Sequence, residues 1–148
     1  MARGDFTVFE EFAIQLGQEL HALASDTLKL GIIDNTAAPT ASDATPAWAD
    51  YSANEVGTGG GYSANGITLS GVTWTEAGGV ATLDDTGNIS LAQNASGFTD
   101  GYWGILYNSS AAGAQAIGFL DLGGPVSEVA GPIAINWNAS GILTVTVS

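Results

Sequence analysis

The sequence predicts a mainly β fold, an antiparallel sandwich or barrel of about seven or eight short strands with one N-terminal α-helix. The 148 residues include 21 glycines, which suit the many tight turns of an all-β domain. After Thr27, short apolar runs recur at intervals of about ten residues. In the last run, Leu143, Val145 and Val147 alternate with polar residues, which is typical of a strand with one buried face.

The best helix candidate covers residues 7–24. Thr7 and Glu10 have the spacing of a capping box, and both glutamates at positions 10 and 11 suit the positive end of a helix dipole. Apolar residues then recur at three- and four-residue steps, which predicts one apolar helical face. These residues are Phe9, Phe12, Ala13, Leu16, Leu20 and Leu23. We therefore expect a single domain over residues 1–148, with an N-terminal arm and helix at 1–24 and a β domain at 27–148.

The remaining apolar runs predict the strands of this β domain. We expect them at residues 27–34, 66–75, 80–83, 88–91, 101–107, 115–122, 132–137 and 141–147. Gly78 and Gly79 between two of these runs predict a hairpin. Residues 35–66 form a long loop in which Tyr51-Ser52-Ala53-Asn54 recurs as Tyr62-Ser63-Ala64-Asn65. A loop of this length is usually functional or flexible.

The charge balance limits the partners of the chain. It has 15 acidic side chains, only two basic ones (Arg3 and Lys29) and a formal net charge of −13. Such a charge repels nucleic-acid phosphates and anionic membrane surfaces, so we expect no direct nucleic-acid contact and no membrane contact. It favours a basic or neutral partner surface, although acidity also serves solubility alone. There is no cysteine, which excludes disulfides and thiolate metal sites.

The titratable residues give no catalytic constellation, so we expect no enzyme activity, no cofactor and no metal site. His21 is the only histidine, and we expect it to be a solvated residue of the helix. Asp84 and Asp85, followed by Gly87, lack the spacing of a calcium loop, so a β-turn is the better interpretation. Calcium binding by these two aspartates remains the alternative.

Two groups of apolar residues are candidates for a partner interface. Trp48, Tyr51 and Tyr62 fall in the long loop, where aromatic side chains have no obvious core role. Phe6, Val8, Phe9 and Phe12 concentrate apolar area near the N-terminus. A helix face of this kind needs a surface against which to be buried. The alternative is that the helix packs on the chain's own sheet.

Two stretches resemble small structural proteins of tailed bacteriophages. Asn54-Glu55-Val56, Gly60-Gly61-Tyr62 and the Gly66–Leu69 segment are similar to an NEV…GGY…G-x-x-L pattern in those proteins. The run from Gly118 to Val126, together with Gly141-Ile142-Leu143, resembles their G-x-x-D-x-G-G-x-V…G-I-L ending. The helix candidate lies outside this resemblance, and the pattern carries no catalytic residues.

The resemblance implies a virion protein that decorates or cements the capsid exterior. Its partner would be the major capsid protein, it would be present in many copies or as a homo-oligomer, and it would be made in the host cytoplasm. The resemblance is equally compatible with a tail or head-fibre module that binds a receptor or a carbohydrate. A decoration protein needs no chemistry, because a protein that binds only the assembled lattice stabilises that lattice by mass action.

Overall fold

A computed structural model describes residues 3–147. Residues 1, 2 and 148, which the predicted domain boundaries include, lie outside the described part. The fold is mainly β, as predicted, and its strands are all paired antiparallel. The strands are β1 (Phe6–Val8), β2 (Leu28–Ile33), β3 (Ile67–Thr68), β4 (Val72–Ala77), β5 (Val80–Asp85), β6 (Ile89–Leu91), β7 (Gly101–Asn108), β8 (Ala116–Val126), β9 (Ile133–Ile135) and β10 (Leu143–Thr146). The helices are α1 (Phe12–Gly17), α2 (Trp48–Tyr51) and the 3₁₀ turn η1 (Ser52–Asn54).

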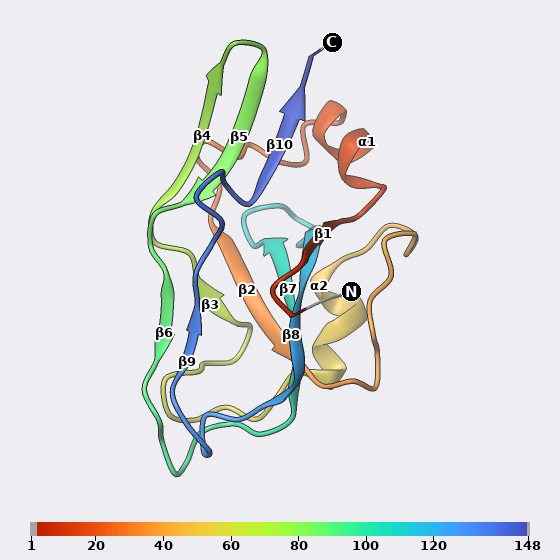
Figure 1. The fold of residues 1–148 in the computed structure, drawn as a ribbon. Helices are drawn as coiled ribbons and strands as arrows, with labels where there is room; N and C mark the ends of the chain where they lie inside the picture. Colours follow the sequence, from red (N-terminus) through yellow and green to blue (C-terminus); the bar gives the residue numbers. More distant parts are fainter. Residues whose placement is uncertain (1–2, 148) are drawn as a thin grey trace.

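The strands form two layers (Figure 1). One layer is a five-stranded sheet in the order β1-β8-β7-β2-β3, and the other combines the sheets β10-β5-β4 and β6-β9. Since β5 leads into β6 and β9 leads into β10, the second layer is one long bent ribbon. The sheets of residues 3–147 do not close into a barrel, so the architecture is that of a sandwich.

The central strands β2 and β7 are buried on both faces. On β2, Leu28, Leu30 and Ile32 face the core between the layers, whereas Ile33 belongs to a second core on the opposite face. The segment between β2 and β3, which contains α2, covers this second core. Burial on both faces explains why the sequence of β2 is almost continuously apolar and alternates only weakly.

The second core depends on a close approach of Trp48 to Gly31. The Trp48 indole stacks on Tyr107, with ring centroids 5.0 Å apart and an interplanar angle of 5°. A Cβ atom at Gly31 would overlap the indole, so glycine is needed here for space. The 35–66 loop is therefore not a free loop, because α2 fastens it to the sheet.

The predicted helix over residues 7–24 is wrong in extent. Residues 6–8 form β1 and pair with β8, and α1 covers only Phe12–Gly17 after an N-cap at Glu11. The predicted capping box therefore does not form, because Thr7 lies in a strand. Glu19 has a φ angle of 61°, which is incompatible with a continuing helix. Phe12 and Leu23 are nevertheless buried, so the apolar residues anchor the segment without a long helix.

The predicted strands after Thr27 are confirmed, with shifted ends. The expected strand at 66–75 is divided into β3 and β4, and β8 extends beyond its predicted end to Val126. The hairpin of β4 and β5 has Gly78 and Gly79 at its turn, with φ angles of 62° and 84°. Two successive positive φ angles are those of the turn that matches the twist of a hairpin.

We predict that Gly31→Ala lowers the free energy of unfolding by about 1–3 kcal/mol, the usual cost of overpacking a core. The added methyl group would displace the Trp48 ring from Tyr107. Gly57→Ala is the control, because a Cβ atom at Gly57 has no neighbour within 4 Å. Denaturant unfolding of both variants measures the difference. Equal stabilities would contradict the close packing at Gly31.

Candidate partner-binding groove

Most of the residues proposed from sequence as an interface are buried in the chain's own core. Phe9, Phe12, Trp48, Tyr51 and Tyr62 are all buried, with Tyr62 only 2% exposed. The expectation that the loop aromatics have no core role is therefore wrong. Phe6 and Val8 remain partly buried and pack against the main core. The chain satisfies its apolar N-terminal residues mainly by itself, as the alternative interpretation held.

Tyr62 shows why the loop aromatics are buried. Its hydroxyl accepts a hydrogen bond from the Ile32 N–H at 2.8 Å and donates one to Glu55 Oε1 at 2.8 Å. Its ring packs edge-to-face on Phe98 at 5.4 Å. Burial raises the pKa of the Tyr62 phenol far above its usual value, and the Glu55 carboxylate raises it further. Tyr62 and Glu55 thus attach the 35–66 loop to β2 by hydrogen bonds.

A carboxylate from a distant part of the chain completes this attachment. Glu128 is 0% exposed, and its Oε1 accepts a hydrogen bond from the Gly61 N–H at 2.6 Å. Cβ atoms at Gly60 or Gly97 would overlap the carboxylate. Its Oε2 has no hydrogen-bond partner among residues 3–147. The glycines of this loop therefore make room for a buried carboxylate, which the sequence did not indicate.

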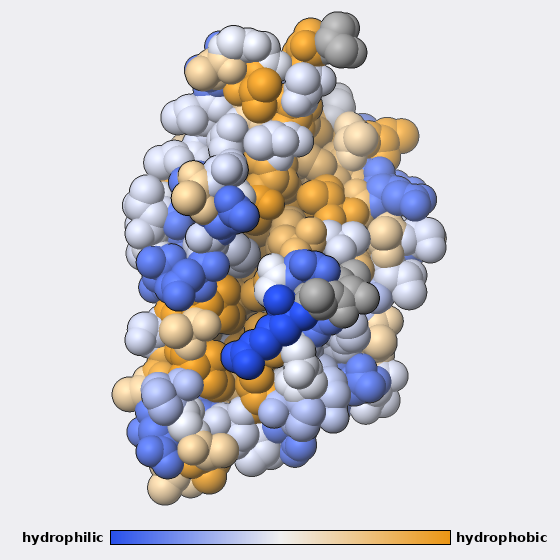
Figure 2. All heavy atoms as spheres, viewed as in Figure 1, coloured by the Kyte–Doolittle hydropathy of each residue, from blue (hydrophilic) through white to orange (hydrophobic). Residues whose placement is uncertain are grey.

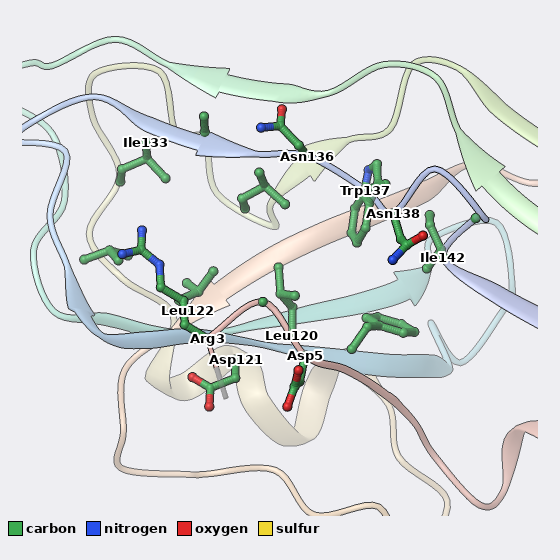
Figure 3. Close-up of a pocket in the computed structure, with 16 residues that line it drawn as sticks. Arg3, Asp5, Leu120, Asp121, Leu122, Ile133, Asn136, Trp137, Asn138 and Ile142 are labelled. Atoms are coloured by element: carbon green, nitrogen blue, oxygen red, sulfur yellow. The ribbon is translucent and has the colours of Figure 1, made fainter. Parts of the chain in front are cut away.

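A groove of about 600 Å³ opens between the two layers of the sandwich. One wall comes from β1 and β8, and the other from β9 and the connection to β10 (Figure 3). Figure 2 shows apolar side chains gathered in this hollow. The apolar lining includes Leu120, Leu122, Val126, Ile133, Ile135 and Ile142.

The groove exists because two strand edges face each other without a strand between them. Within residues 3–147, β1 pairs only with β8, and β9 pairs only with β6. Phe6 from β1 meets Trp137, which follows β9, in an edge-to-face contact at 6.2 Å. This contact joins the two layers at one place, and the rest of the mouth stays open.

Three charged residues line the groove, Arg3, Asp5 and Asp121, and the Arg3 side chain extends into it. Its stem packs on Gly123, where a Cβ atom would lie 2.7 Å from three of the arginine carbons. Figure 3 shows its guanidinium reaching into the space between β8 and β9, whereas the carboxylates of Asp5 and Asp121 turn to the other face of β8. Within the described residues Arg3 makes no hydrogen bond or ion pair. An unpaired guanidinium is notable in a chain with 15 acidic side chains.

The Gly118–Val126 run and the Gly141–Leu143 segment line this groove. The first part supplies Leu120, Leu122 and Val126, and the second part supplies Gly141 and Ile142. The two parts are separated along the chain, and they meet only because β8 and the β9–β10 connection lie on opposite walls. Nothing local in the sequence indicates that the two parts converge.

Asp85 and His21 are structural residues in this fold. The Asp85 carboxylate accepts hydrogen bonds from the N–H groups of Gly71 and Gly87, at 2.7 and 3.1 Å, and from Trp137 Nε1 at 3.2 Å. It therefore links β4, β5 and the groove wall. No group of three or more His, Asp or Glu residues arranged to hold a metal occurs in the part of the chain that is described.

His21 is buried, so the prediction that it is solvated is wrong. Its ring nitrogens lie 3.0 Å from Gln15 Oε1 and 3.3 Å from Asn108 Nδ2. Burial lowers the pKa of His21, and the nearby Asp26 carboxylate partly opposes this shift. These contacts link α1, through Gln15, and the segment that follows α1, through His21, to Asn108 at the end of β7.

Comparisons with models of known protein families, with curated protein sequences and with solved structures found no match. No helix within residues 3–147 has the length and apolar character needed to cross a membrane.

We predict that His21 makes the protein less stable as the pH falls through the range just below neutrality. Because its folded-state pKa is lowered, the unfolded chain binds the proton more readily, and the free energy of unfolding decreases from about pH 7 downward. His21→Gln should remove this part of the pH dependence. Denaturant unfolding between pH 8 and pH 5 measures it, and carboxylate titration is common to both proteins. Parallel pH profiles would show that His21 is not buried as a neutral ring.

Proposed function

We propose that the chain is a non-enzymatic structural protein of a virus particle. It binds the exterior of the assembled capsid, contacts the major capsid protein and stabilises the lattice as a decoration or cement protein. It acts in many copies or as a homo-oligomer on the particle surface. No cofactor takes part.

The groove is the observation that carries this proposal. A sandwich that leaves a groove with apolar and polar walls open between its layers offers a concave surface on which a partner can bind. Residues of the Gly118–Val126 run and the Gly141–Leu143 segment line the groove, so the part of the sequence that resembles phage structural proteins coincides with the part of the surface suited for attachment.

The charge of the chain supports the same function. A net charge of −13 disfavours contact with the packaged DNA and favours a position on the outside of a shell. Stabilisation then follows from binding alone. A protein that binds the assembled lattice better than separate subunits shifts the equilibrium toward the assembled state.

The alternative is a tail or head-fibre module that binds a receptor or a carbohydrate. Such a module would stack sugars on exposed aromatic side chains. Trp48, Tyr51 and Tyr62, the loop aromatics proposed from the sequence as a partner interface, are buried and offer no such surface, whereas Trp74 and Trp103 on the strands are partly exposed.

The proposal predicts that purified protein binds particles that lack it and makes them more resistant to heat. Co-sedimentation measures binding, and the temperature of genome release measures stabilisation. Electron cryomicroscopy should place the added protein on the shell. Unassembled capsid subunits are the control and should bind more weakly, because stabilisation requires preference for the lattice. Density only on the tail or fibres, or no binding to particles, would overturn the proposal.

A further inference from the structure

We infer that the groove between β1 and β9 binds an extended segment of a partner protein with alternating apolar and polar side chains, and that an acidic side chain of this segment pairs with Arg3. The identity of the partner as a capsid subunit rests on the proposed function. The chemistry of the segment follows from the walls of the groove, its strand edges and its charge.

The walls offer contacts to apolar side chains on one face of such a segment. Leu120 and Leu122 on β8 face Ile133 on β9 across the groove (Figure 3), and Ile135 also lines it. A volume of about 600 Å³ is in the range of sites that enclose several side chains. These side chains are already largely buried, so an occupant adds only a modest gain from apolar burial, at roughly 25 cal/mol per Å², and depends also on the polar groups of the groove.

The strand edges favour an extended backbone. The Asp121 N–H donates to the Asp5 carbonyl, which fixes the alternation of the β1–β8 ladder. By this alternation, Phe6 and Val8 turn their N–H and C=O groups away from β8, toward the outer edge. An extended peptide satisfies such groups by adding a strand. A fatty-acid anion would fill the apolar space but leave these groups unused.

Arg3 sets the charge of the segment. It is one of two basic side chains in the chain, and it has no partner among the described residues. The carboxylates of Asp5 and Asp121, which are near in sequence and in space, point to the opposite face (Figure 3). A guanidinium binds a carboxylate in a fixed, two-pronged geometry. The segment should therefore carry an aspartate or glutamate that reaches Arg3.

The first test uses two fluorescently labelled, end-blocked peptides in which Val and Thr alternate around a central residue, Asp in one and Asn in the other. Fluorescence anisotropy measures their affinity for the intact chain. We expect the Asp peptide to bind about tenfold more tightly, as a charge-assisted hydrogen bond allows. Arg3→Gln should abolish this preference. Lys29→Gln removes the same charge from β2 and should leave the preference unchanged.

A second pair of variants tests the apolar wall. Val126→Asp should weaken the binding of both peptides, because Val126 lines the groove. Val129→Asp is the matched control, because Val129 is exposed and is not part of the lining. Thermal unfolding verifies that both variants are folded. Binding of both peptides that is unaffected by Val126→Asp, or a preference for Asp that survives Arg3→Gln, would overturn the inference. Tighter binding of laurate than of the Asp peptide would replace a protein segment with a lipid anion.

The same variants separate this inference from the proposed function. If wild type, Arg3→Gln and Val126→Asp all bind particles equally, the protein decorates through another surface and the groove inference fails alone. If the Asp peptide binds with dependence on Arg3 but particles do not bind the wild type, the groove inference holds and the proposed function fails. If Arg3→Gln and Val126→Asp weaken both peptide and particle binding, while the controls do not, both are supported.

Discussion

Burial of β2 on both of its faces is the constraint on which the rest of the structure depends. Leu28, Leu30, Ile32 and Ile33 are fully inaccessible to solvent, and strands β7 and β3 flank them. One face needs the second layer of the sandwich as a cover. The other face needs the segment that follows β2, which explains why Trp48 lies over Gly31 and why the long connection cannot be free. The two cores are thus two consequences of one apolar strand.

The same arrangement leaves the edges of the sandwich unequal. The central strands are covered, whereas β1 and β9 lie at edges on the same side, where Phe6 contacts Trp137. Edge strands with open backbone groups are a liability that proteins usually blunt or use. Further along β8, Gly123, Gly124 and Pro125 interrupt regular pairing, which blunts that half of the edge. The open part is therefore confined to β1 and β9, where the groove lies.

The strands could be predicted from the sequence because the patterns that indicate them are local. Alternation within β10 and the paired glycines between β4 and β5 are both readable over a few residues. The prediction of a long N-terminal helix was wrong. Phe9, Phe12 and Leu16 have helical spacing, but the pairing of Thr7 with Phe119 on β8 outweighs that local preference. The burial of the loop aromatics was missed for a related reason. Gly31 makes space for Trp48, and no local sequence pattern indicates that these two residues are in contact. The groove depends on residues from both ends of the chain, which only the fold brings together.

Gly123 connects the Gly118–Val126 run to the charge in the groove. Its φ angle of +81° suits glycine, and the Arg3 stem occupies the place where a Cβ atom would be. The Asp121 carboxylate accepts a hydrogen bond from the Gly123 N–H at 2.7 Å, which holds this carboxylate in a turn and away from Arg3. Without that turn, a nearby aspartate would be a natural ion-pair partner for the guanidinium. The Asp-x-Gly spacing therefore shapes the end of β8 and fixes the Asp121 carboxylate in its turn, while the proposed acidic partner would reach Arg3 from the groove side.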